Sequence, residues 1–149
     1  FIVLFSTLLI SACSTAKKAK VDTVDDVYTG TDTVEFLAKG VPDRIFFATN
    51  KSKLTTASRD TLRKQATWMR KNKDVTVTVE GHADERGTRE YNLALGERRA
   101  NAAKDYLMTY GVSGKRISVI SYGKERPVNP ASSPLAWSQN RRSVTVKAN

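Results

Sequence analysis

Cysteine and histidine are almost absent from this chain of 149 residues, which contains one of each. A single cysteine excludes an internal disulfide and any metal site built from several thiolates. A single histidine, His82, leaves little material for acid–base catalysis or for metal binding through imidazoles. No serine lies in a GxSxG motif, so the nearby pair of His82 and Asp84 does not indicate a catalytic triad. We therefore predict a protein that is not an enzyme and that needs no metal and no cofactor.

Long apolar runs are missing beyond the first dozen residues. Phe1 to Ile10 (FIVLFSTLLI) is apolar and uncharged, but it is far shorter than the ~20 residues that a membrane-spanning helix needs. Its length is typical of the hydrophobic part of an export signal. It leads into Ile10-Ser11-Ala12-Cys13, which resembles a bacterial lipobox, where the cysteine becomes the lipidated N-terminus. The alternative is a buried structural cysteine at the edge of an apolar helix.

Neither a methionine nor a basic residue precedes Phe1, so we expect residues 1–12 to be a partial lipoprotein signal peptide. Lipidation of Cys13 would make residues 13–33 a link to the membrane. They are rich in Ser, Thr, Lys and Asp without helical or strand periodicity, which predicts a flexible tether. Ser14 follows the cysteine, where an aspartate would indicate retention in the inner membrane by analogy with known lipoproteins. We therefore expect an outer-membrane anchor, with residues 34–149 folded and facing the periplasm.

Acidic residues are too few to balance the basic ones, and the net charge is +10. The excess lies in the part predicted to fold, because lysines and aspartates nearly cancel in the tether. Such a surface attracts polyanions in general, including nucleic acid, acidic lipid and carboxylate-rich cell wall. A small basic nucleic-acid binder is therefore one alternative. No nucleic-acid motif is visible, so we predict only weak, salt-labile binding and no nucleic-acid partner.

Strand and helix patterns alternate along the folded part. We predict strands at 44–48, 74–80, 117–122 and 142–147, helices at 54–71 and 89–110, and a short helical turn near Trp137. The strict Val/Thr alternation in 75–79 indicates a half-buried strand. This order predicts an α/β (α+β) fold: a mixed four-stranded sheet with helices packed against it, in the order β-α-β-α-β-β with the helical turn before the last strand.

Both helices show a stripe that we predict to face the core. In the first helix the stripe is Leu62, Ala66 and Met69. In the second, a projection at about 100° per residue puts one set of side chains on a single stripe. This set is Tyr91, Leu95, Ala102 and Tyr106.

The most distinctive stretch is Gly81 to Ala100, GHADERGTREYNLALGERRA. It resembles the OmpA-like peptidoglycan-binding domain, and the lipoprotein members of that family fit best. The similarity covers roughly residues 41–146, and three further pieces agree with it: FFATNKSKL at 46–54, SYG at 121–123 and NRRSV at 140–144. The resemblance implies a protein that tethers the outer membrane to peptidoglycan and engages TolB and other Tol proteins during envelope constriction. The alternative is the same domain in a motor stator or a porin relative.

The resemblance also implies that the ligand is the meso-diaminopimelate of the wall's stem peptide, held by Asp84 and Arg99. The side-chain end of diaminopimelate carries an ammonium and a carboxylate on one carbon, so its binding site needs one fixed anion and one fixed cation. Arginine suits the carboxylate because its planar fork donates two parallel hydrogen bonds. We expect Asp84→Ala and Arg99→Ala each to abolish binding while the fold stays intact. The alternative is a surface ion pair between Asp84 and Arg99 worth ~0–1 kcal/mol.

Three further residues are predicted to line the same site. Asn92 lies two turns before Arg99 on nearly the same flank of the helix, with a structural or surface role as its alternative. The resemblance adds Asn50, in the loop after the first strand. Successive strand residues face opposite ways, so only one of Arg141 and Arg142 can point into the pocket. We predict that Arg142 does so.

Overall fold

The computed structural model describes residues 26–149. The predicted signal peptide, the predicted lipidation site Cys13 and most of the predicted tether lie outside the described residues. The elements are β1 (Phe36–Ala38), β2 (Val41–Pro42), β3 (Arg44–Phe46), α1 (Thr56–Lys71), β4 (Val77–His82), α2 (Arg89–Thr109), the 3-10 turn η1 (Gly114–Arg116), β5 (Ile117–Gly123), α3 (Pro134–Asn140) and β6 (Arg142–Lys147). No helix among residues 26–149 has both the length and the apolar character needed to cross a membrane.

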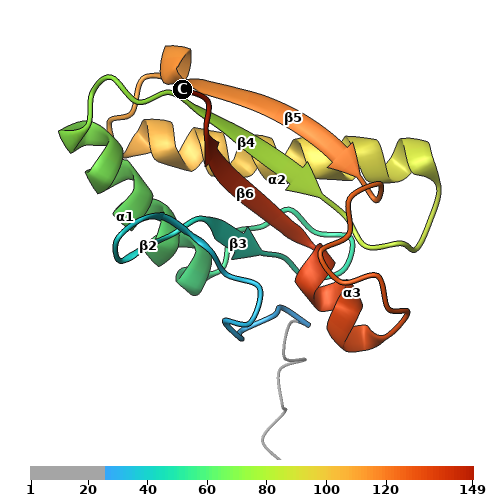
Figure 1. The fold of residues 1–149 in the computed structure, drawn as a ribbon. Coiled ribbons are helices and arrows are strands. Elements are labelled where there is room, and N and C mark those ends of the chain that lie inside the picture. Colours follow the sequence, from blue (N-terminus) through green and yellow to red (C-terminus); the bar gives the residue numbers. More distant parts are fainter. Residues whose placement is uncertain (1–25) are drawn as a thin grey trace, which may run out of the picture.

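Four strands form one mixed sheet in the order β3-β6-β4-β5. The neighbours β4 and β5 run parallel, whereas β6 runs antiparallel to both β3 and β4 (Figure 1). The predicted mixed sheet and its order along the chain are therefore confirmed. The short pair β1 and β2 forms a separate two-stranded sheet. It was not predicted, because strands of two and three residues are too short to show a periodicity.

The helices α1 and α2 cover the same face of the main sheet and share one core with it. Val77 and Val79 of β4 are fully buried there, as the Val/Thr alternation predicted. The stripe of α1 is also confirmed, because Leu62, Ala66 and Met69 are at most 1% exposed. Thr55 caps the helix by accepting a hydrogen bond from the backbone N–H of Ser58, which satisfies one of the free donors at its start.

The predicted stripe of α2 is wrong in part. Leu95 is buried, but Tyr91 is 41% exposed, and Ala102 and Tyr106 are only half-buried. The face that meets the sheet consists of Asn92, Leu95, Gly96, Arg99, Ala100, Ala103 and Leu107. The projection counted the tyrosines as apolar core residues. In the structure Gly96 and the polar side chains of Asn92 and Arg99 face the sheet instead.

Gly81 and Gly96 explain this rotation. A Cβ atom on Gly81 would lie 1.7 Å from the carbonyl oxygen of Gly96, and one on Gly96 would lie 2.3 Å from Oγ of Ser121. Only glycine at both positions lets the backbone of α2 lie directly on β4. Ser121 completes the contact by donating a 2.7 Å hydrogen bond to the carbonyl of Leu93. The end of β4 and the inward side of α2 are thereby brought together.

Residues 26–33, the last part of the predicted tether, contact the domain. The ring of Tyr28 packs edge-on against Phe46 at a centroid distance of 4.9 Å. The carboxylate of Asp26 accepts a 2.9 Å hydrogen bond from the backbone N–H of Thr49. The ordered contacts of the domain therefore begin before residue 34, where the change in composition had placed the boundary.

Candidate functional site

A cavity of about 330 Å³ lies where the loop after β3, the loop after β4 and the first half of α2 meet. We call it the Asp84 pocket. It is lined by Thr49, Asn50, Asp84, Arg86, Gly87, Tyr91, Asn92, Leu95 and Arg99. Four of the five predicted binding residues, namely Asn50, Asp84, Asn92 and Arg99, are therefore gathered around one cavity. The fifth, Arg142, is not among them.

Asp84 is a fixed anion in this pocket. It is 6% exposed and accepts hydrogen bonds from the backbone N–H of Arg86 at 3.0 Å, from Nη2 of Arg86 at 2.8 Å and from Nη1 of Arg141 at 3.2 Å. Burial pushes the pKa of Asp84 upward, but the hydrogen bonds from Arg86 and Arg141 outweigh it, so this pKa lies below its usual value. The carboxylate is therefore ionised at neutral pH. Its ion pairs are with Arg86 and Arg141, so the alternative of an Asp84–Arg99 surface pair is wrong.

Arg99 is a fixed cation at the floor of the pocket. Its side chain is 0% exposed and donates to the carbonyl oxygens of Ala48 at 3.0 Å, Lys51 at 2.9 Å and His82 at 2.9 Å. Burial and the charge of Arg141 lower the pKa of Arg99 to about 10, which still leaves it positive at neutral pH. Three of the five guanidinium N–H groups are used, and the other two make no hydrogen bond among the described residues.

The burial of Arg99 has two consequences. Among residues 26–149 its guanidinium forms no direct ion pair. The charge of Asp84 favours the ionised form of Arg99 but is shared with Arg86 and Arg141, and a buried charge without a direct counter-ion is costly. A carboxylate entering the pocket would supply that counter-ion. The three carbonyls also show that Arg99 braces the loop after β3 against the end of β4, so Arg99→Ala is not expected to leave the fold intact. The earlier expectation for this variant is revised accordingly.

The two asparagines occupy different places. Asn92 is 2% exposed and donates a 2.9 Å hydrogen bond from Nδ2 to the carbonyl of Arg86, which fixes the loop after β4. Asn50 has φ of 57°, a left-handed conformation that asparagine tolerates better than most residues. Its exposed side chain makes no hydrogen bond within the described part of the chain. Asn92 therefore shapes the pocket wall, whereas Asn50 stands at its mouth with its amide available.

The prediction that Arg142 points into the pocket is wrong. Arg141 does not line the pocket either, but it is the one of the two arginines that contacts Asp84. Nη1 of Arg141 contacts Asp84, and its Nε donates 2.9 Å to the carbonyl of Phe47. Arg142 is the first residue of β6 and pairs with Phe46; its guanidinium donates to the carbonyls of Asn140 and Arg126 instead. Arg141 lies at the C-cap of α3, so strand alternation alone does not set its direction.

Arg86 was not predicted, although it lies inside the quoted motif. Its side chain is 41% exposed, lies over the ring of Trp137 at 4.2 Å and donates to Oγ1 of Thr49 at 3.2 Å. The backbone N–H of Arg86 bonds the carboxylate two residues earlier, which is an Asx turn. An arginine two residues after an aspartate in a loop was the available signal. Arg86 is the pocket's partly exposed cation, in contrast to the buried Arg99.

His82, at the end of β4, is buried and uncharged. It is 2% exposed, and neither ring nitrogen has a hydrogen-bond partner among the described residues. Burial, followed by the charges of Arg142, Arg44 and Arg126, lowers the pKa of His82 to about 3. The ring stacks on Tyr122 at 5.5 Å. In the described range no group of three or more His, Cys, Asp and Glu side chains is placed to hold a metal ion.

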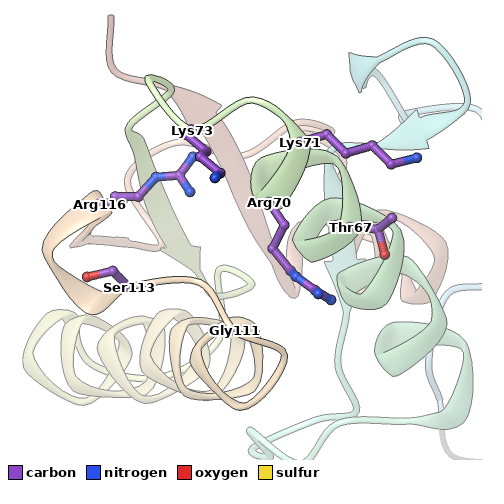
Figure 2. Close-up of a pocket in the computed structure, with 7 residues that line it drawn as sticks. All are labelled: Thr67, Arg70, Lys71, Lys73, Gly111, Ser113 and Arg116. Carbon is purple, nitrogen blue, oxygen red and sulfur yellow. The ribbon is translucent and has the colours of Figure 1, made fainter.

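A larger hollow of about 650 Å³ lies between the C-terminal ends of α1 and α2; we call it the basic groove. Its lining is Thr67, Arg70, Lys71, Lys73, Gly111, Ser113 and Arg116 (Figure 2). Arg116 is committed to the carbonyls of Met69, Asn72 and Val75, and Lys71 points away from it in Figure 2. No acidic side chain lines the groove, so it lacks the anion that a zwitterionic ligand requires.

Comparison with known proteins places this chain in a family. Residues 46–141 match the OmpA family. The peptidoglycan-associated lipoprotein of Brucella melitensis is 44% identical over 150 residues, covering 97% of this chain and 89% of the relative. That of Mesorhizobium japonicum is 55% identical over 106 residues, covering 71% of this chain but 63% of the relative, so the chain spans less than two thirds of that protein.

Solved structures agree with the sequence comparison. The crystal structure of the peptidoglycan-associated lipoprotein from Burkholderia pseudomallei matches with a TM-score of 0.69 and 32% identity, over 70% of this chain and 89% of that one. The C-terminal domain of Helicobacter pylori MotB matches with a TM-score of 0.67 at 23% identity, over 72% of this chain and 84% of that one; it shares the fold. The chain therefore belongs to the OmpA family, and the peptidoglycan-associated lipoproteins are the members that it resembles over most of its length.

Proposed function

We propose that this chain is an outer-membrane lipoprotein, anchored through Cys13, whose periplasmic domain binds peptidoglycan non-covalently and links the membrane to the wall without catalysing a reaction. The observation that carries the proposal is the Asp84 pocket, because one cavity has an ionised carboxylate on its wall and, on its floor, a buried cation that forms no direct ion pair among the described residues. The name of the relatives, peptidoglycan-associated lipoprotein, supports the same ligand.

The pocket fits the zwitterionic end of meso-diaminopimelate. Its ammonium would pair with Asp84 and displace the exposed guanidinium of Arg86. Its carboxylate would take the two remaining N–H groups of Arg99, with Arg86 free to turn toward the same group. Asn50, whose amide is available at the mouth, and Asn92, which holds the loop after β4, would complete the contacts. Arg142 has no direct part in this proposal, and Arg141 replaces it as the arginine that positions Asp84.

Sedimentation with purified sacculi tests the site. Asp84→Asn keeps the shape and the hydrogen-bond acceptor but removes the charge, so we expect binding to diaminopimelate-type sacculi to fall about 100-fold or more. Asp105→Asn is the matched control, because it makes the same charge change at an exposed position outside the pocket. This variant should bind normally. Circular dichroism would show that both variants are folded. Undiminished sedimentation of Asp84→Asn would contradict the site.

The chemistry of the wall supplies a second test. In sacculi whose stem peptide carries lysine instead of diaminopimelate, the ammonium stays but the adjacent carboxylate is missing. The proposal predicts much weaker binding of the unchanged protein to such sacculi, because no ligand carboxylate would pair with Arg99. Equal binding to both wall types would rule out diaminopimelate as the recognised group.

The anchor and the partners need separate tests. We propose, from the family resemblance, that the protein engages TolB and other Tol proteins during envelope constriction, which chemical crosslinking in intact cells followed by detection of TolB would examine. For the anchor, metabolic labelling with palmitate should mark the unchanged protein and leave Cys13→Ser unmarked. An unlabelled Cys13 would favour the alternative of a stator or porin relative.

A further inference from the structure

The segment 26–34 contacts the wall of the Asp84 pocket through its first residue, Asp26. Tyr28 packs against Phe46, and directly after the segment the backbone N–H of Asp43 donates to the carbonyl of Glu35 at 2.9 Å, so this segment lies against the domain. At its start Asp26 reaches Thr49, a residue that lines the pocket. The part of the chain that leads toward the N-terminus is therefore in direct contact with the pocket wall.

Five side chains form a closed ring at this contact. Asp26 accepts from the backbone N–H of Thr49 at 2.9 Å and from its hydroxyl, and that hydroxyl accepts from Arg86 at 3.2 Å. Arg86 pairs with Asp84, and Asp84 pairs with Arg141 at 3.2 Å. Arg141 closes the ring through its 3.2 Å ion pair with Asp26 and a hydrogen bond to the carbonyl of Asp26. We call these five residues the Asp26 ring.

The charges in and beside the ring show how Asp26 affects the electrostatic surroundings of Asp84. Without Asp26, one carboxylate, Asp84, would face three arginines: Arg86, Arg141 and Arg99. The other nearby acid, Glu85, accepts a 2.8 Å hydrogen bond from Nε1 of Trp137 and forms no ion pair with Arg141 or Arg99 among the described residues. A ligand ammonium approaching Asp84 would then meet a strongly positive surrounding. Asp26 offsets Arg141, so that more of the field of Asp84 is available to the ammonium.

An ordinary surface ion pair is the alternative explanation of Asp26, whose side chain is 54% exposed. Its partner differs from a surface residue, however, because the side chain of Arg141 is only 2% exposed, and solvent screens such a buried charge poorly. Partial burial raises the pKa of Asp26, but the hydrogen bonds from Thr49 and the charge of Arg141 lower it further, so this pKa lies below its usual value. Asp26 therefore carries its charge at neutral pH.

We infer that Asp26 is a positioning residue of the Asp84 pocket, which sharpens recognition of the ligand ammonium by neutralising Arg141 and by holding Thr49. This inference rests on the proposed binding of diaminopimelate. Because Asp26 also begins the segment 26–34, docking of that segment and occupation of the pocket are coupled, and the coupling is reciprocal by thermodynamic necessity. Release of Asp26 from the ring lowers the affinity for peptidoglycan, and a bound ligand stabilises the docked position of the segment 26–34.

A charge-removing variant tests the inference. Asp26→Asn keeps an acceptor for the Thr49 N–H but loses the ion pair with Arg141. The matched control is Asp32→Asn, which makes the same charge change at an exposed position of the same segment. The probe is a soluble muropeptide ending in meso-diaminopimelate, titrated calorimetrically against the unchanged protein and both variants. We expect a dissociation constant about fivefold higher for Asp26→Asn, corresponding to ~1 kcal/mol, and no change for Asp32→Asn.

A second probe separates positioning from mere structural support. When the side-chain amine of the muropeptide is acetylated, the ammonium is gone, and Asp26→Asn should bind this probe as well as the unchanged protein does. Hydrogen exchange adds a readout for coupling: saturating muropeptide should slow exchange at Val34 in the unchanged protein, and less so in Asp26→Asn.

The outcomes distinguish the two proposals. Equal affinities of Asp26→Asn and the unchanged protein for the diaminopimelate muropeptide would overturn the role of Asp26 and leave the proposed function standing. An equal loss with both probes would also overturn it, because it would show a general structural effect. Failure of the unchanged protein to bind the muropeptide or sacculi would instead overturn the proposed function itself.

Discussion

The Asp84 pocket and the basic groove are both rich in arginine, yet they hold their charges differently. Arg99, which lines the pocket, and Arg141, which contacts Asp84, are 0% and 2% exposed, and backbone carbonyls direct each guanidinium. In the groove, Arg70 and Lys73 are exposed and make no hydrogen bond within residues 26–149. Buried, directed charges act at short range and select geometry, whereas exposed charges of one sign attract any anion and are screened by salt.

Arg116 shows that a braced arginine alone does not make a binding site. Like Arg99, it donates to three backbone carbonyls, in this case at the C-terminal end of α1. Such a cation stabilises the free carbonyls at the end of a helix. What distinguishes Arg99 is the ionised Asp84 at the same cavity. The lesson is that the pair of opposite fixed charges, and not the arginine content, identifies the pocket.

The largest expected effect separates these two arginines. In Arg99→Lys one ammonium cannot reach the carbonyls of Ala48, Lys51 and His82 together, so we expect a loss of ~2–4 kcal/mol in the free energy of unfolding and at least a tenfold weaker binding of the muropeptide. Arg116→Lys removes the same kind of bracing and should lower stability without weakening binding at a temperature where it is folded. Urea denaturation and calorimetric titration measure the two quantities.

A loss of muropeptide affinity in Arg116→Lys comparable to that in Arg99→Lys would remove the distinction between the two sites. So would full affinity in Arg99→Lys, since it would show that the planar fork of Arg99 is not used by the ligand.

The effect of intermediate size is a loss of stability at acid pH, which arises at His82 beside the pocket. The carbonyl of His82 anchors Arg99, and the pKa of the His82 ring in the fold is about 3 against an ordinary 6.5. Below pH 6.5 the His82 ring binds a proton in the unfolded chain but stays neutral in the folded chain. The free energy of unfolding therefore falls as the pH drops from 6.5 toward 3. Between pH 6.5 and 4.5 the loss is roughly 2–3 kcal/mol.

His82→Phe keeps a ring that can stack on Tyr122 and removes the titrating group without losing a hydrogen bond. Its free energy of unfolding should therefore change less between pH 6.5 and 4.5 than that of the unchanged protein, as measured by urea denaturation at each pH. Parallel pH curves for the two proteins would show that His82 does not cause the acid sensitivity.

The sequence predicted those features that depend on a regular local pattern. The alternating valines placed β4, and the spacing of Leu62, Ala66 and Met69 placed α1, because each element has one clearly apolar face. The pattern misplaced the inward face of α2, because the close contact of Gly81 and Gly96 is a tertiary feature. Helical periodicity counts apolar side chains and assigns no role to a glycine that lets two backbones touch.

Only part of the candidate site could be predicted from the sequence. Asp84 and Arg99 followed from the motif, but the choice between Arg141 and Arg142 depended on how α3 ends, and strand alternation does not extend across that junction. Asp26 lies in a segment whose composition predicts a tether, and its partners Thr49 and Arg141 are 23 and 115 residues away. No local pattern reports such long-range contacts.

The smallest expected effect lies in the basic groove. A combined Arg70→Gln, Lys71→Gln and Lys73→Gln variant removes its exposed cations and leaves Arg116 in place. We expect its affinity for the muropeptide to change less than about twofold, because the groove is outside the pocket and solvent screens its charges. Its retention on a polyanionic resin should fall at low salt and match the unchanged protein at high salt, as expected for unspecific attraction. A muropeptide affinity lowered as strongly as in Arg99→Lys would mean that the groove takes part in wall recognition, and the contrast between fixed and screened charges would fail.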